Sequence, residues 1–99
     1  MYNYDVSLKE NIVIEIQELA EKCNLDKVIL FGSRARRDNR EKSDIDLAIS
    51  GGNSAEFATA VDDEINTLLF FDVVDMGLPI SDELTESINR EGICIYEKV

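Results

Sequence analysis

The sequence predicts a small α/β domain, in which helices pack against a single mixed β-sheet. Segments with strand character alternate along the chain with segments of helical periodicity. The exception is the interval between Phe31 and Ser43, which is too short for a crossover helix, so the strands that flank it are expected to be antiparallel neighbours. The 99 residues are 44% hydrophobic, and a single globular domain over residues 1–99 is expected.

The first half of the chain is expected to form a helix, a strand, a short helix and a second strand. Ser7 and Glu10 have the spacing of a capping box, which predicts a helix over Leu8–Cys23. Its inner face consists of apolar residues at helical spacing, namely Ile12, Ile16, Leu19 and Cys23. The first strand is expected at Lys27–Phe31, the short helix at residues 33–37 and the second strand at Ser43–Ser50.

The second half is expected to form a helix, a strand, a helix and an edge strand. After the glycine turn at residues 51–52, Asn53 or Ser54 is expected to cap a helix that runs to about Leu69. The apolar face of this helix is Phe57, Val61, Ile65 and Leu68. The third strand, Phe70–Met76, can then lie beside the second. The last helix is expected to begin at Ser81 and end at Gly92, before a short edge strand at Ile93–Glu97.

The charge of the chain limits its partners. The formal net charge is −11, which argues against binding along a nucleic-acid backbone of any length. Half of the ten Lys and Arg residues nevertheless lie close together, as Arg34, Arg36, Arg37, Arg40 and Lys42. A local cationic patch on an acidic protein suits a compact polyanion such as a nucleoside triphosphate.

Composition excludes several other chemistries. The chain contains no histidine, which excludes Cys–His catalysis, the serine triad and ordinary zinc sites. Cys23 and Cys94 lie in apolar segments and are expected to be small buried hydrophobes. Tyr2, Tyr4 and Tyr96 are expected to be packing residues or surface aromatics.

The sequence shows no signal for a membrane. No apolar stretch approaches the roughly 20 residues of a membrane span. The start of the chain, Met1 to Asp5, has no basic region followed by an apolar one. A cytoplasmic location is therefore expected.

Two aspartates of the second strand are candidate metal ligands. Asp44 and Asp46 alternate with Ile45 and Leu47, so both carboxylates lie on one face, about 6–7 Å apart at the backbone. A solvated strand face is the alternative, but two neighbouring acids destabilise a short strand unless they are used. Oxygen ligands favour Mg²⁺ or Mn²⁺ over zinc, and two-metal sites are common in nucleotidyl and phosphoryl transfer.

The region from Val28 to Asp75 resembles a known family. The motif Gly32-Ser33-x-Ala35-Arg36 followed by Ser43-Asp44-Ile45-Asp46-Leu47 is similar to the signature of the DNA polymerase β-like nucleotidyltransferase superfamily. Within that superfamily the chain most resembles the minimal nucleotidyltransferases (MNT type), which are antitoxins partnered with HEPN-domain toxins. The resemblance implies the polymerase β-like nucleotidyltransferase fold. The family usually has glycine after the Ala-Arg pair, whereas this chain has Arg37, so either the turn is built differently or Arg37 extends the short helix.

The resemblance also implies a third carboxylate, in a later strand. Asp72, between Phe71 and Val73, fits the pattern apolar-Asp-apolar. Asp75 lies three residues further on, on the other side of the strand, and is expected to be a strand-end or helix-facing residue. By resemblance, Asp44, Asp46 and Asp72 ligate two Mg²⁺ ions (or Mn²⁺), and Asp72 polarises the attacking hydroxyl.

The Gly-Ser pair is the candidate phosphate site. Gly32 is either an ordinary turn glycine or a position where the missing side chain lets phosphates approach the backbone. Ser33 can cap the short helix and also bind the β- and γ-phosphates. One of Arg34 and Arg36 is expected to neutralise the triphosphate. The remaining basic residues, Arg37, Arg40 and Lys42, are expected to be solvated loop charges or contacts to an acidic partner, and Ser43 is expected to order the entrance to the second strand.

These features together predict a Mg²⁺-dependent nucleotidyltransferase that binds ATP. The resemblance implies that AMP is transferred to a hydroxyl, a tyrosine of a HEPN toxin, and that the chain is an antitoxin which forms a hetero-complex or an oligomer. One alternative is a non-catalytic antitoxin that masks its partner by binding. Another is a small-molecule nucleotidyltransferase similar to those that modify aminoglycosides, which carry an extra acceptor-binding domain for which 99 residues leave no room.

Overall fold

The structure is a computed structural model that describes residues 5–99. The expectations for Tyr2 and Tyr4 lie outside the described residues. Tyr96 is half-buried and packs against the core.

One four-stranded mixed sheet organises the fold, with the strand order β3-β2-β1-β4. β1 (Lys27–Phe31) pairs antiparallel with β2 (Ile45–Ser50) and with β4 (Ile93–Glu97), while β2 pairs parallel with β3 (Phe71–Asp75). The predicted α/β class, the antiparallel first pair, the position of the third strand beside the second and the edge position of the last strand are all confirmed.

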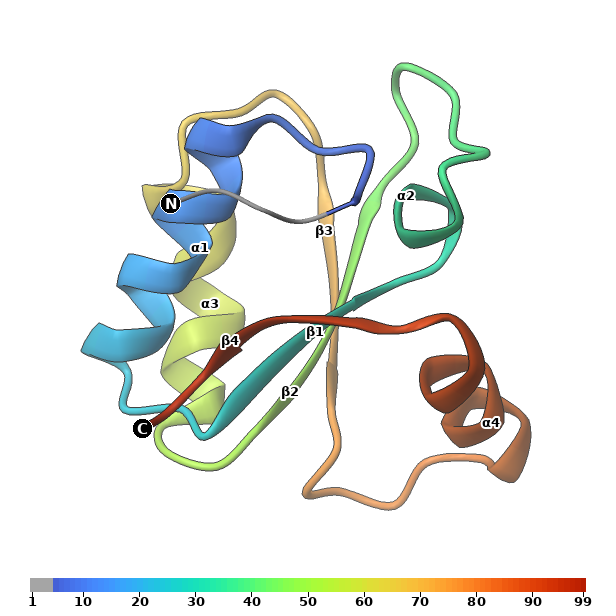
Figure 1. Ribbon diagram of the computed structural model, residues 1–99. Coiled ribbons are helices and arrows are strands. Elements are labelled where there is room, and N and C mark those ends of the chain that lie inside the picture. The colour runs from blue at the N-terminus through green and yellow to red at the C-terminus, as the bar shows by residue number, and fades with distance from the viewer. Residues whose placement is uncertain (1–4) are drawn as a thin grey trace.

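Helices cover both faces of this sheet (Figure 1). α1 (Glu10–Lys22) and α3 (Ser54–Glu64) lie together on one side, and their apolar faces join the main core. α4 (Asp82–Glu91) lies on the opposite side, where Ile88 packs against Phe31 and Ala48. The four-residue helix α2 (Ser33–Arg36) follows β1 at the end of the sheet where β2 begins. Side chains alternate between the two faces of β2. Ile45, Leu47 and Ile49 therefore face α1 and α3, and Asp46 lies on the α4 side.

The predicted capping box at the start of α1 is wrong. The helix begins at Glu10, and its N-cap residue Lys9 makes no side-chain cap bond. The backbone of Ser7 instead bonds to Arg34: the Ser7 amide donates to the Arg34 carbonyl at 2.9 Å, and the Ser7 carbonyl accepts from Arg34 Nη1 at 2.9 Å. This long-range pairing holds Ser7 away from the helix. The predicted inner face of the helix is confirmed, because all four apolar residues are buried.

The helix predicted to run to Leu69 ends at Glu64. Ile65 has extended backbone angles (φ −88°, ψ 128°), and the chain from there to β3 is not helical. Leu68, which was expected on the inner face, is 100% exposed, because the apolar periodicity continues past the point where the backbone leaves the helix. The caps of α3 and α4 are as predicted: Asn53 accepts from the Glu56 amide, and Ser81 accepts from the Leu84 amide.

The two cysteines differ in their surroundings. Cys23 is buried as expected, and burial raises the pKa of its thiol. Cys94 is exposed on the edge strand β4, so the expectation that both are buried is wrong for Cys94.

Within residues 5–99, none of the helices is long and apolar enough to cross a bilayer.

Candidate functional site

Asp46 and Asp72 are paired residues on neighbouring strands. They stand opposite each other in the parallel register of β2 and β3. Asp72 lies between Phe71 and Val73, which pack on the main core, so its side chain lies on the α4 side of the sheet, as that of Asp46 does. Asp46 is half-buried, and Asp72 is exposed.

The charges around Asp46 show that three carboxylates gather here. Burial, and then the negative charges of Asp72 and Asp44, raise the pKa of Asp46 to about 6. Asp44 is exposed and precedes β2 by one residue. The structure thus brings the three predicted ligands to one end of the sheet and onto one face, with the half-buried Asp46 among them.

The carboxylates supply the donor type that Mg²⁺ and Mn²⁺ prefer. Among residues 5–99, no three acidic or cysteine side chains are already arranged to enclose a metal ion. Asp44 and Asp72 are exposed, however, so their side chains can turn toward Asp46 without unpacking the core. A divalent cation would relieve the repulsion that raises the pKa of Asp46, so the donor set fits such an ion.

Gly32 lies directly against Asp46. Its backbone has φ +76°, and a Cβ built there would lie 2.2 Å from Asp46 Oδ2. Only glycine adopts this conformation without strain and leaves room for the carboxylate. The missing side chain is therefore explained first by Asp46, while the approach of a phosphate to this backbone stays a prediction.

The turn after β1 places Ser33 at the start of α2. The amides of Ala35 and Arg36 both donate to the Gly32 carbonyl at 3.1 Å, which closes the short helix. The Ser33 hydroxyl has no hydrogen-bond partner within residues 5–99 and is free to bind a ligand. Arg37 ends the helix with left-handed angles (φ 67°, ψ 26°), so it adopts the conformation that a glycine would take, at some steric cost.

The structure separates the two arginine candidates. Arg34 is 6% exposed, and its guanidinium donates to the backbone carbonyls of Ser7, Glu41 and Ser43 at 2.9–3.1 Å. These bonds tie the N-terminal segment and the loop before β2 to α2, so Arg34 has a structural role. Arg36 is exposed and remains the candidate for binding a phosphate.

Glu91, at the end of α4, is a member of this site that the sequence analysis missed. Its carboxylate accepts from Arg36 Nη1 at 2.9 Å and from the Gly32 amide at 3.2 Å. Hydrogen bonds with Asp38, and then with Glu91, hold the pKa of Arg36 above its ordinary value. Glu91 lies 59 residues from Gly32 in the sequence, and no local pattern indicates the contact.

The remaining polar residues have other roles. Asp75 faces α3, accepting from the Ser54 hydroxyl at 2.7 Å, which agrees with the expected helix-facing position. The Ser43 hydroxyl accepts from the Arg40 amide at 2.9 Å and so orders the entrance to β2. Arg37, expected to be a loop charge, is exposed and pairs with Asp5.

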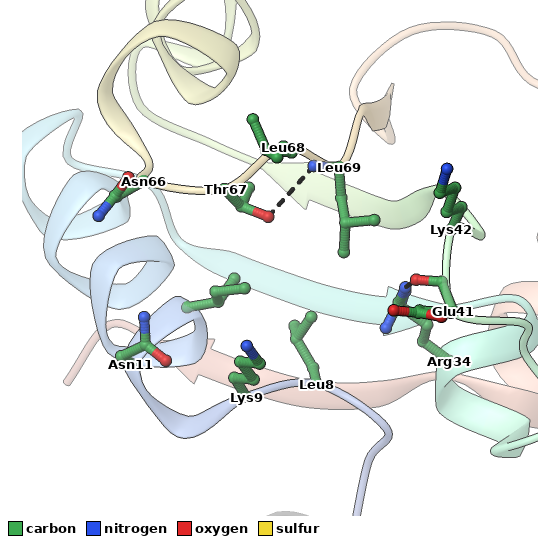
Figure 2. Close-up of a pocket in the computed structure, with 11 residues that line it drawn as sticks. Leu8, Lys9, Asn11, Arg34, Glu41, Lys42, Asn66, Thr67, Leu68 and Leu69 are labelled. Atoms are coloured by element: carbon green, nitrogen blue, oxygen red, sulfur yellow. Dashed lines mark hydrogen bonds between the residues drawn. The ribbon is translucent and has the colours of Figure 1, made fainter.

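A pocket of about 680 Å³ lies apart from the carboxylates, between the start of α1, the loop before β3 and the loop before β2 (Figure 2). Leu8 and Leu69 form part of its apolar lining, and Lys9 and Lys42 lie at its sides. Of the predicted site residues it contains only Arg34, whose hydrogen bonds are already directed to backbone carbonyls. The candidate site is therefore the open surface around Gly32 and Asp46, and not this pocket.

The raised pKa of Asp46 predicts a pH-dependent effect of Asp46→Asn on stability. Because the folded pKa lies above the ordinary value of 3.8, the native state loses stability as the pH rises from about 4 through about 6. The shift corresponds to at most roughly 3 kcal/mol, and we expect about 1–2 kcal/mol because solvent reaches the side chain. The variant should therefore be more stable than the wild type by this amount at pH 8, and equally stable at pH 3.5.

Urea unfolding with a metal chelator present measures this difference. Asp63→Asn on α3 is a matched control, since Asp63 is exposed and makes no ion pair or hydrogen bond within residues 5–99. If Asp46→Asn raises the free energy of unfolding equally at both pH values, the ionised Asp46 carboxylate does not destabilise the native state.

Comparisons with known proteins identify the family and the fold. Residues 14–99 match the family model described as "Polymerase beta, Nucleotidyltransferase". A solved structure described as a toxin-antitoxin with AMP-PNP is similar with a TM-score of 0.65 and 24% identity, over 92% of this chain and 75% of that chain. A structure described as the Y104A mutant of the toxin-antitoxin MntA-HpeT is similar with a TM-score of 0.64 and 25% identity, over 92% of this chain and 74% of that chain.

A third solved structure, from Shewanella oneidensis, has a TM-score of 0.67 and 15% identity, over 92% of this chain and 74% of that chain. No curated protein matches the sequence. The family match covers most of the chain and includes Gly32, Ser33 and all three candidate carboxylates. The chain therefore belongs to the polymerase beta nucleotidyltransferase family.

Proposed function

We propose that this chain is an antitoxin that transfers AMP from ATP to a hydroxyl of its partner, a tyrosine of a HEPN-domain toxin. The observation that carries the proposal is the gathering of Asp44, Asp46 and Asp72 beside the Gly32 turn. Burial and the charges of Asp72 and Asp44 raise the pKa of Asp46. Keeping Asp46 ionised beside these carboxylates is costly for stability, and a site that binds cations and phosphates gives the cluster a use.

Each residue has a role in the proposed reaction. Asp44, Asp46 and Asp72 would hold two Mg²⁺ ions, or Mn²⁺, which neutralise phosphate charge and polarise the reacting oxygens. The Ser33 hydroxyl and Arg36 bind the phosphate tail. Asp72 lies nearest the open edge of the sheet, because β3 is an edge strand, and it accepts a hydrogen bond from the acceptor hydroxyl.

The reaction itself is an in-line displacement. The acceptor oxygen forms a bond to the α-phosphorus of ATP, the bond to the bridging oxygen breaks, and pyrophosphate leaves. The proton of the acceptor hydroxyl passes through Asp72 to solvent. Positioning and electrostatic stabilisation supply the rate enhancement, which is consistent with a chain that has no histidine.

Three further observations support a protein partner. Two of the similar structures are described as a toxin-antitoxin, one of them with AMP-PNP. The net charge of −11 favours a basic partner. Phe70, which is 74% exposed, precedes Asp72 by two residues, and Leu68, two residues earlier in the sequence, is fully exposed. A protein that presents a hydroxyl to Asp72 would cover this apolar pair.

The same apolar pair favours one alternative, an antitoxin that only masks its partner. The two functions differ in stoichiometry and in the requirement for ATP. If the chain is a transferase, a tenth of an equivalent should neutralise the toxin when ATP and Mg²⁺ are present. Inactivation should then persist after the antitoxin is removed.

The proposed partner, a HEPN-domain toxin, is the material for this experiment, with its activity as the readout. Omission of ATP and the variant Asp72→Asn are the negative controls, and both should leave the toxin active at a tenth of an equivalent. Neutralisation that needs a full equivalent, proceeds without ATP and survives Asp72→Asn would establish masking instead.

A further inference from the structure

Glu91 joins the last turn of α4 to the Gly32 turn. One carboxylate oxygen lies 3.2 Å from the Gly32 amide nitrogen, and both oxygens lie 2.9 Å from Arg36 Nη1. The Glu91 side chain is 14% exposed, whereas the Arg36 side chain is 45% exposed. The Glu91 carboxylate is therefore largely buried between two hydrogen-bond donors, the Gly32 amide and the Arg36 guanidinium.

A carboxylate in this position resembles a bound phosphate chemically. Backbone amides and arginine are the two donor types that most often bind phosphate oxygens in proteins. The carboxylate occupies both of them in the free protein, and it adds a negative charge next to Asp46, whose pKa it helps to raise. An incoming triphosphate therefore meets donors that are already bonded, beside a like charge.

We propose that Glu91 is an internal competitor for the triphosphate: its carboxylate occupies the Gly32 amide and Arg36, and it must move away before the phosphate tail binds. The inference rests on the proposed function, because it assigns these two donors to the phosphates. A residue of α4 would then control the affinity for the nucleotide, although α4 contributes none of the candidate carboxylates.

The structure indicates which part moves. α4 is anchored to the sheet by Ile88, which is 3% exposed and packs against Phe31 and Ala48. A displacement of the whole helix would open this small core. The Glu91 side chain has three rotatable bonds and can leave the donors while the helix stays in place. A rearrangement of this side chain is therefore sufficient.

Glu91→Gln tests the proposal, because it keeps the shape of the side chain and removes its charge. We expect it to tighten the binding of inorganic tripolyphosphate about five- to tenfold in the absence of metal, and the binding of Mg²⁺-ATP by a similar factor. Glu86→Gln is the matched control. It removes the same charge from the same helix, at an exposed residue whose carboxylate pairs with Arg90 and not with Gly32 or Arg36, and it should change both affinities less than twofold.

Isothermal titration measures both affinities, and the backbone amide resonance of Gly32 reports whether the contact itself has changed. An unchanged or weaker tripolyphosphate affinity in Glu91→Gln, with the Gly32 resonance shifted, would overturn the proposal and show that Glu91 positions the turn. If tripolyphosphate binds as predicted but Mg²⁺-ATP binds to neither protein, the proposed transferase function fails while the anion competition stands. If tripolyphosphate binds to neither protein, the competition is refuted directly.

Discussion

Replacing Asp44 and Asp46 together by asparagine is expected to lower the rate of nucleotidyl transfer at least about a thousandfold, with the protein still folded. Loss of two of the three proposed metal ligands should remove several kcal/mol of transition-state stabilisation, and about 4 kcal/mol corresponds to a thousandfold in rate. The native state should be as stable as the wild type or more so, because the repulsion that raises the pKa of Asp46 disappears.

Release of pyrophosphate in the presence of ATP, Mg²⁺ and the partner measures the rate, and the urea midpoint reports the fold. The control variant, Asp63→Asn with Glu83→Gln, also removes two acidic charges, from exposed positions on α3 and α4. It should retain transfer within twofold. If the Asp44–Asp46 variant keeps more than a tenth of the wild-type rate, these carboxylates are not the metal ligands.

Gly32→Ala is expected to weaken the binding of Mg²⁺-ATP at least tenfold, which is about 1.4 kcal/mol. The new methyl group would lie 2.2 Å from Asp46 Oδ2, so the carboxylate or the turn has to move. The positive φ of Gly32 (φ 76°, ψ −158°) lies in a region that residues with a Cβ rarely adopt, and it adds a cost of about 1–3 kcal/mol to the folded state. The variant therefore disturbs the proposed phosphate turn and a proposed metal ligand together.

Gly51→Ala separates this local effect from a general loss of stability. Gly51 has φ +78°, and a Cβ there would lie 2.2 Å from Asp26 Oδ2, so it also combines a positive φ with a close carboxylate, at the opposite end of β1 and β2. Both variants should lower the urea midpoint to a similar extent, and only Gly32→Ala should lose nucleotide affinity. Equal nucleotide affinities for the two variants would place the phosphates away from the Gly32 turn.

Features fixed by local pattern could be predicted from the sequence. The observed bounds of β1 and β4 are identical to the predicted ones, because each strand is a short apolar run between turn residues. The antiparallel pairing of β1 with β2 followed from the length of the connection alone. The α/β class could be predicted because local propensity and topology agree over most of the chain.

The helix ends that were predicted wrongly depend on contacts between distant parts of the chain. Ser7 has the sequence of a capping residue, but its backbone is bound by Arg34, 27 residues away. Leu68 continues a helical pattern beyond Glu64, where the backbone has already turned toward β3. Such competition between local and distant partners is not visible in a single sequence.

Some residues of the candidate site could likewise be selected from the sequence, whereas the roles of others depend on their surroundings in the fold. Asp44 and Asp46 could be selected from their alternation with apolar residues, and Asp72 from the resemblance to the family. The roles of the arginines could not be assigned, because Arg34 and Arg36 differ only in what surrounds them: backbone carbonyls around one, and Asp38 and Glu91 around the other. Arg37 takes a left-handed conformation that its residue type disfavours, so neither of the two outcomes expected from the sequence occurs.

The intact mass of the proposed partner toxin shows whether AMP is transferred to it. The proposed partner, a HEPN-domain toxin, is incubated with a tenth of an equivalent of the protein, ATP and Mg²⁺, and its mass is compared with that from the same reaction containing Asp72→Asn. We expect the mass of the toxin to increase by one or more AMP units in the wild-type reaction only. A toxin that is inhibited but unchanged in mass would contradict this expectation.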